Sequence, residues 1–158
     1  MNKILSIFKY IFLMVLPSII WSQDCIDGIE VELWDECYNI NETTWLDLFG
    51  QGLSGGIPPE IGDLVNLYGL HLSNNNLTGE IPQEIGNLTN LSQLGLWGNN
   101  LTGNIPSEIG NLTNLTDLIL GENNFTGEIP LGIGNLISLR QLDIWGSNLS
   151  GQIPSSIG

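Results

Sequence analysis

Few residues in this 158-residue chain are candidates for acid–base catalysis. Asp117 and Asp143 could act as the pair of carboxylates that glycosidases use. The chain carries a 24-residue repeat, and the two aspartates occupy different positions within it. Nothing indicates a closed cleft that would raise the pKa of one of them. No repeated Ser/His/Asp arrangement and no glycine-rich phosphate loop is visible. The sequence therefore predicts a non-catalytic protein, with a carbohydrate-active enzyme as an alternative.

Metal ligands are equally scarce. Cys25 and Cys37 are the only cysteines, and His71 is the only histidine. Two cysteines supply too few ligands for a zinc site, and His71 lies far from them in the repeat. We therefore expect no metal and no cofactor. Because residues 1–22 indicate an exported protein, we predict a disulfide between Cys25 and Cys37.

Residues 1–22 have the order of a secretory signal peptide. Lys3 and Lys9 provide a basic start, an apolar run extends from Ile11 to Leu16, and Ser22 is a small residue before the expected cleavage site. The alternative is an uncleaved membrane anchor, although the uninterrupted apolar part is about half of the roughly 20 residues that a span requires. We expect a secreted or cell-surface protein. Contact with a membrane is expected only if this segment is retained or the full-length chain has an anchor.

The charge of the chain restricts its partners. The net charge is −14 at pH 7, and after removal of residues 1–22 Arg140 is the only Lys or Arg beside 17 Asp and Glu residues. Such a surface repels phosphate backbones and anionic membranes, so we expect no nucleic acid partner. A basic protein partner or a neutral ligand is compatible with it. Solubility alone would also explain the charge.

Residues 23–44 differ in composition from the rest and are expected to form an acidic N-terminal cap. Ile29, Val31 and Leu33 alternate with glutamates, which is the pattern of a half-buried strand. A repeat array needs atypical terminal units to cover the open end of its core. The acidic residues lack the ligand spacing of a known calcium loop.

Residues 45–158 carry a repeat. A phrase of the type Leu-Thr-Gly-x-Ile-Pro-x-x-Ile-Gly-Asn-Leu restarts every 24 residues, which indicates a solenoid of about five coils. Alternating inward apolar residues predict one short strand per coil, stacked about 4.8 Å apart into a parallel sheet on the concave face. These inward pairs are Leu46/Leu48, Leu70/Leu72, Leu94/Leu96, Leu118/Leu120 and Leu142/Ile144. Pro82 and Pro106 are each expected at the first position of a 3-10 turn on the convex face, with a glycine just after the turn.

Two residue types within the repeat have predicted backbone roles. Asn75, Asn99 and Asn123 share one register just after the strand, where a carboxamide can both donate to and accept from backbone groups. We predict that they form a structural asparagine ladder. The glycine of Leu-Thr-Gly, for example Gly79 or Gly103, is expected at positive φ.

The repeat phrase resembles the 24-residue, plant-type leucine-rich repeat over about residues 44–158. This subtype is found in receptor-kinase ectodomains, polygalacturonase-inhibiting proteins and some secreted bacterial proteins. The segment Trp34-Asp35-Glu36-Cys37 is similar to the family's N-terminal cap, although the cysteine spacing departs from it. The resemblance implies an α/β solenoid, a leucine-rich-repeat horseshoe, that acts as a recognition scaffold and leaves the ligand open. Because every earlier repeat continues beyond the point where Gly158 ends the chain, we expect the solenoid to be truncated or its end to be covered by a partner.

The outward strand positions form columns along the concave face, and aromatic residues that the consensus does not require fall there. Such aromatics are common recognition anchors, although they could simply cover neighbouring backbone. We predict a non-catalytic extracellular scaffold that binds a protein, peptide or glycan through this face. The predicted ligand-binding residues are Trp45, Asp47, Phe49, His71, Gln93, Trp97, Asp117, Ile119, Gln141, Asp143 and Trp145.

A regular row of hydroxyl side chains supports an alternative function. Thr78, Thr102 and Thr126 recur at the spacing of the coils, flanked by Ser54 and Ser150. Such a row could order water on an ice-binding or matrix-contact surface. Threonine at this position could equally serve the turn.

Overall fold

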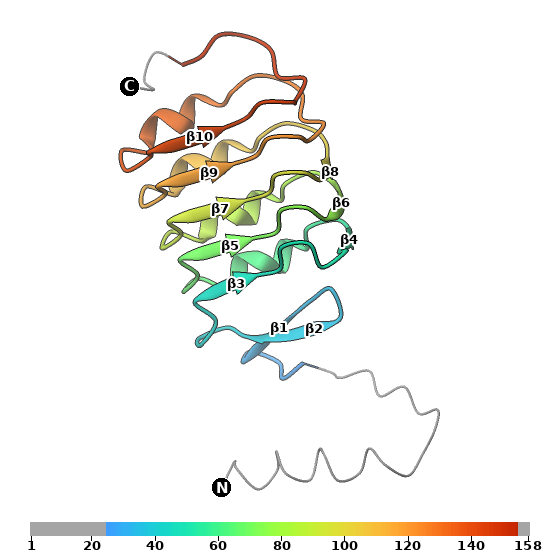
Figure 1. The fold of residues 1–158 in the computed structure, drawn as a ribbon. Coiled ribbons are helices and arrows are strands. Elements are labelled where there is room, and N and C mark those ends of the chain that lie inside the picture. The colour runs from blue at the N-terminus through green and yellow to red at the C-terminus, as the bar shows by residue number, and fades with distance from the viewer. Residues whose placement is uncertain (1–24, 155–158) are drawn as a thin grey trace, which may run out of the picture.

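The computed structural model describes residues 25–154. The predicted signal peptide, residues 1–22, lies outside the described residues, as do residues 155–158. The described part is a stack of coils that follows an N-terminal β-hairpin (Figure 1). Among these residues, no helix is long and apolar enough to cross a membrane.

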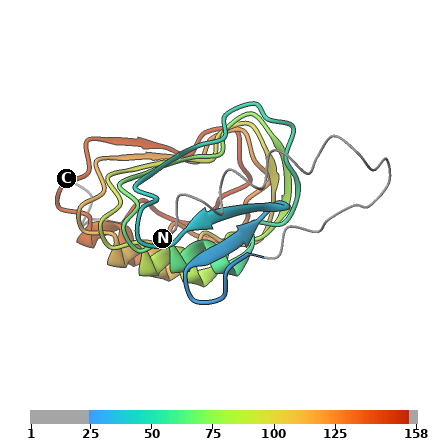
Figure 2. The same cartoon turned by 90° about the horizontal axis from the view of Figure 1, so that it is seen from below.

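Each coil has three sides. One side contributes a strand to a five-stranded parallel sheet in the order β10-β9-β7-β5-β3. Its strands are β3 (Trp45–Asp47), β5 (Gly69–His71), β7 (Gln93–Gly95), β9 (Asp117–Ile119) and β10 (Gln141–Asp143). The third side consists of 3-10 helices that lie across the coils from this sheet (Figures 1 and 2). These helices are η2 (Pro59–Asp63), η3 (Gln83–Asn87), η4 (Ser107–Asn111) and η5 (Leu131–Asn135). The predicted solenoid, with strands on one face and 3-10 turns on the other, is confirmed.

The second side of the coils carries a smaller parallel sheet that the sequence reasoning missed. Its strands are β4 (Ser54–Gly55), β6 (Asn76–Gly79) and β8 (Asn100–Leu101), paired in that order. We expected only a turn around each Leu-Thr-Gly. The signal was nevertheless present, because buried Leu77 lies between exposed Asn76 and Thr78, which is the alternation of a half-buried strand.

The N-terminal cap is a hairpin of β1 (Glu30–Leu33) and β2 (Glu36–Asn39). Trp34 and Asp35 form its two-residue turn with φ of 50° and 65°, as tight hairpin turns require. Val31 and Leu33 point into the core of the first coil. Figure 2, which looks along the stack from the N-terminal side, shows the hairpin lying across the end of the coils.

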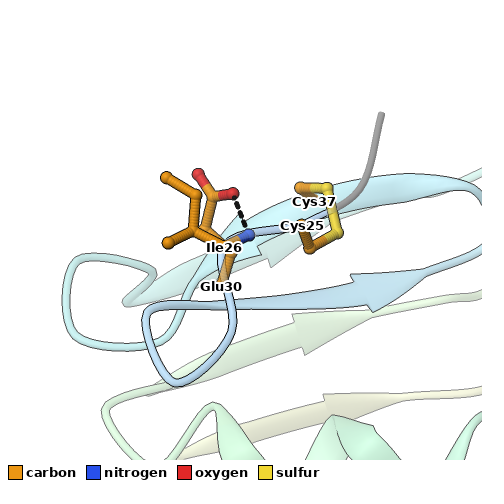
Figure 3. The surroundings of a disulfide bond; sticks show 4 residues. All are labelled: Cys25, Ile26, Glu30 and Cys37. Carbon is orange, nitrogen blue, oxygen red and sulfur yellow. Dashed lines mark hydrogen bonds between the residues drawn. A yellow bond between two sulfur atoms is a disulfide. The ribbon is translucent and has the colours of Figure 1, made fainter. Parts of the chain in front are cut away.

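The expected disulfide joins Cys25 to Cys37 and fixes the start of the described chain to β2 (Figure 3). The two Cα atoms are 5.5 Å apart. Beside the disulfide, the Ile26 backbone N–H donates to Glu30 Oε2 at 3.0 Å. The cap is therefore held by one covalent bond and by the apolar side of β1.

The core is a column of aliphatic side chains enclosed by the three sides of the coils. Within one coil, Leu94, Leu96, Leu101, Ile109 and Leu112 are all essentially inaccessible to solvent. Burying each such side chain stabilises the fold by about 1.5–3 kcal/mol. Because every coil repeats these positions, the register of the sheet is fixed: Leu70 pairs with Leu94, and Leu94 with Leu118.

Three asparagines are the only buried polar side chains among the described residues, namely Asn75, Asn99 and Asn123. Asn99 Nδ2 donates to the carbonyls of Leu72 and Leu96, at 3.0 Å each, and Asn99 Oδ1 accepts from the Leu77 N–H at 3.1 Å. Asn75 and Asn123 make the equivalent bonds one coil earlier and one coil later. Each asparagine thus ties its own coil to the preceding one.

The predicted start and stop of the 3-10 turns were wrong in detail. Pro82 and Pro106 are not the first helical residues: they precede η3 and η4 in an extended conformation, with ψ near 140°. Gly86 lies inside η3 rather than after it, and a Cβ at this position would lie 2.6 Å from Glu108 Cβ and 2.8 Å from the Glu108 carbonyl oxygen. Glycine is therefore needed for the close packing of successive helices. The predicted positive φ of the Leu-Thr-Gly glycines is confirmed, for example 76° at Gly79.

Candidate ligand-binding face

The outward side chains of the five-stranded sheet line one open groove of about 520 Å³. Parallel pairing aligns the strand positions into columns, so that Gln93 lies beside Asp117, and Gly95 beside Ile119. A third column follows the strands, where the Asn74 N–H donates to the Trp97 carbonyl at 2.7 Å and the Glu122 N–H to the Trp145 carbonyl at 2.8 Å. The groove is lined by Phe49, His71, Ser73, Gln93, Leu94, Gly95, Trp97, Asp117, Ile119, Asp143 and Trp145.

Eight of the eleven residues predicted from the sequence line this groove. The exceptions are Trp45, Asp47 and Gln141, which occupy the same columns but not the groove itself. Ser73 and Gly95 lie in the predicted columns but were not among the predicted ligand-binding residues, and Leu94 was predicted to point inward. Leu94 points into the core, and Gly95 beside it carries no side chain, so the groove reaches the backbone at this point.

The N-terminal end of the sheet has an aromatic cluster. The ring of Trp45 lies directly over Gly69, where an added Cβ would clash with the indole. Its centroid is 5.0 Å from that of Tyr68 and 4.9 Å from that of His71. Tyr68 was not predicted as a site residue, because it precedes the strand. Trp45 therefore covers a neighbouring strand. At this position the structure agrees with the alternative that the aromatic side chains simply cover neighbouring backbone.

His71 connects this cluster to the groove. Its Nε2 lies 3.2 Å from Gln93 Oε1, within hydrogen-bond distance, so the ring is held between Trp45 and Gln93. Ser73 also lines the groove, but among the described residues no hydrogen bond joins its hydroxyl to His71.

The C-terminal end of the groove combines carboxylates with tryptophans. Trp145 is 58% exposed, and Trp97 and Asp143 are half-buried. Gly121 is buried, and a Cβ placed on it would lie 2.7 Å from Asp143 Oδ1 and 3.2 Å from both Cδ1 and Nε1 of Trp145. The Asp143 carboxylate and the edge of the Trp145 indole therefore converge over the backbone of Gly121, which carries no side chain.

The carboxylates on this face accept local hydrogen bonds. Asp47 Oδ1 accepts from the Phe49 N–H at 3.1 Å, and Asp143 Oδ1 from the Trp145 N–H at 3.3 Å. Asp117 Oδ2 accepts from the Thr116 hydroxyl at 2.7 Å. These bonds orient the side chains and leave acceptor capacity on each carboxylate. Among the described residues, no cluster of His, Cys, Asp or Glu has the composition of a metal site.

The hydroxyl row begins on the smaller sheet, where Ser54 lies in β4 and Thr78 in β6, and continues past its last strand; none of its members lines the groove. Thr102 Oγ1 donates to the Gly79 carbonyl at 3.3 Å, Thr126 Oγ1 to that of Gly103 at 3.4 Å, and Ser150 Oγ to that of Gly127 at 3.1 Å. Each hydroxyl thus binds the preceding coil. These bonds give the row a structural role.

A coil that combines a short strand, an asparagine ladder and a 3-10 helix within 24 residues defines a leucine-rich-repeat solenoid. The family model for the leucine-rich repeat region matches residues 46–157, and the chain belongs to this family. No curated protein sequence matches the chain.

Solved structures of receptor ectodomains resemble the chain closely. A TDR receptor is 39% identical with a TM-score of 0.72, over 73% of this chain and 20% of the receptor. The Arabidopsis receptor kinase HAESA, solved with the peptide hormone IDA and the co-receptor SERK1, is 40% identical with a TM-score of 0.70, over 73% of this chain and 20% of that chain. A chain of the BIR3–SERK2 complex from Arabidopsis thaliana is 41% identical with a TM-score of 0.68, over 71% of this chain and 60% of that chain. The predicted resemblance to receptor-kinase ectodomains is confirmed, and the chain spans less than two thirds of each of these structures.

Proposed function

We propose that this protein is a non-catalytic extracellular recognition module that binds a peptide or protein segment along the groove of the five-stranded sheet. The observation that carries the proposal is the segregation of side chains within each coil. Residues that recur in most coils point into the core or bind backbone, as Leu96 and Asn99 do. The outward strand columns, by contrast, differ in composition from coil to coil, and their residues, such as Trp97 and Trp145, line the groove.

The comparisons support a peptide or protein ligand. HAESA is solved with a peptide hormone and a co-receptor, and BIR3 with SERK2. A groove open along its length suits an extended segment, whose side chains can reach several coils. The Cys25–Cys37 disulfide supports an oxidising, extracellular location.

Selection of ligands from a phage-displayed library of random dodecapeptides on the purified protein tests this proposal. The Trp97→Ala/Trp145→Ala variant should lose at least tenfold in affinity for the selected peptides, because exposed aromatics in a groove are typical anchors. The matched control is Leu131→Ala/Ile137→Ala, which removes two side chains that are 80% and 89% exposed outside the groove. Peptides that bind the double tryptophan variant and the wild type equally would contradict the proposal. A glycan array probed in parallel would reveal a carbohydrate ligand instead.

A further inference from the structure

Among the described residues, the groove is lined by carboxylates but by no lysine or arginine side chain. Arg140 is the only Lys or Arg among the described residues; it is exposed and does not line the groove. No ion pair occurs in the described part of the chain. Asp117 and Asp143 are half-buried in the groove wall without a cationic partner. Low-dielectric walls around charges of one sign concentrate the field and attract the opposite charge.

The two carboxylates can reach a single bound group. Gln141 pairs with Asp117, and Asp143 pairs with Ile119, so the two aspartates are diagonal neighbours on adjacent strands. Standard strand dimensions place their Cα atoms roughly 8 Å apart. Ile119 shares a strand with Asp117 and pairs with Asp143, so an apolar side chain lies next to both carboxylates.

Two tryptophans flank this pair. Asp143 Oδ1 and the indole edge of Trp145 converge over Gly121, and a larger residue at 121 would displace them. Trp97 stands in the same column, one coil before Gly121, and also lines the groove. A carboxylate beside an exposed aromatic side chain favours an organic cation, because the carboxylate supplies charge and the ring supplies apolar surface for the carbon stem of the cation. A strongly hydrated metal ion would gain little from the rings.

We infer that the Asp117–Asp143–Trp145 end of the groove binds an arginine or lysine side chain of a peptide ligand. The inference rests on the proposed function and specifies the chemistry of its ligand. The cationic head pairs with Asp117 and Asp143, while its methylene stem packs on Ile119 and Trp97. Arginine fits better than lysine, because its planar guanidinium both pairs with carboxylates and stacks on aromatic rings.

The dodecapeptide selection tests this inference on the same protein. Arginine or lysine should be enriched in the selected peptides. For one such peptide, replacing the basic residue by citrulline, which is neutral and of nearly the same shape, should weaken binding at least tenfold. The Asp117→Asn/Asp143→Asn variant should bind the basic peptide at least tenfold more weakly, and should prefer it over the citrulline peptide much less than the wild type does.

A matched control separates this site from the overall negative charge. Glu60→Gln/Asp63→Asn removes two exposed carboxylates on η2, outside the groove, and should leave the affinity within about twofold. Should the asparagine substitutions unfold the protein, the wild type remains informative. Its affinity for the basic peptide should fall as NaCl increases, and that for the citrulline peptide should not.

The outcomes distinguish the two proposals. Peptides that depend on Trp97 and Trp145 but show no basic enrichment, or that bind the double asparagine variant equally well, overturn the cation site and leave the proposed function intact. The cation site is also overturned if Glu60→Gln/Asp63→Asn weakens binding of the basic peptide as much as Asp117→Asn/Asp143→Asn does. Absence of any tryptophan-dependent peptide overturns both.

Discussion

The buried asparagines explain how a strand only three residues long can be held in place. Asn99 satisfies two carbonyls and one N–H that neither sheet pairs. Because Leu72 and Leu77 belong to the preceding coil, the bonds act between coils as well as within one. Removing the carboxamide leaves buried backbone groups without a partner, and such groups are expensive in a dry interior.

Asn99→Ala should therefore lower the free energy of unfolding by about 1–3 kcal/mol. Urea denaturation followed by circular dichroism measures this change. Asn100→Ala is the matched control, because Asn100 is the exposed neighbour, and it should change stability by less than about 0.5 kcal/mol. Equal effects of the two substitutions would show that the ladder does not stabilise the fold.

Gly69 sets the position of Trp45, because an added methyl group would occupy the place of the indole ring. Gly69→Ala should destabilise by about 1–3 kcal/mol through overpacking. The loss should be smaller in the Trp45→Ala background, since the clash is then absent; the double-mutant cycle measures this coupling. Gly56→Ala, whose new Cβ meets nothing closer than 3.9 Å, is the control. Additive effects of the two changes would contradict the proposed contact.

At the scale of elements, the stacking of the 3-10 helices depends on glycine. The Cβ of an alanine at 86 would lie 2.8 Å from the backbone oxygen of Glu108, which cannot move without separating η3 from η4. Gly86→Ala should therefore destabilise by about 1–3 kcal/mol in thermal or urea unfolding. Gln83→Ala changes an exposed residue of the same helix and should be nearly neutral. A neutral Gly86→Ala would mean that the coils can separate easily.

The cap hairpin depends on its disulfide more than the inner coils do. Closing a loop of about 15 residues stabilises by about 3 kcal/mol in the chain-entropy model. Cys25→Ala/Cys37→Ala should therefore accelerate hydrogen exchange of the β1 and β2 amides, while β7 and β9 remain protected. The outcome that contradicts this expectation is uniform loss of protection, which would show that the cap and coils unfold as one unit.

At the scale of the whole molecule, periodicity determined how much could be predicted. A fixed 24-residue spacing assigns every residue to a column, so the five strands and the inward leucines follow from the sequence alone. The local geometry of the backbone and side chains was harder to predict. The extended conformation of Pro82, the pairing of Asn76–Gly79 and the inclination of Trp45 over Gly69 depend on contacts between coils. Three of the predicted residues, Trp45, Asp47 and Gln141, fall outside the groove, because a column gives the composition of the face but not its depth.

The charge of the whole molecule gives the last prediction. The described residues combine one arginine with many carboxylates and contain no ion pair, so mutual repulsion among carboxylates opposes folding. Increasing NaCl from 10 mM to 500 mM should therefore raise Tm by a few degrees, because salt screens the repulsion. The rise should be smaller for Glu60→Gln/Asp63→Asn, which carries two fewer carboxylates. A Tm that falls over this range would mean that the charges of the folded protein attract one another on balance, and that salt screens this attraction. Binding of a basic peptide should weaken over the same range, so ionic strength separates the charge that opposes folding from the charge that attracts a ligand.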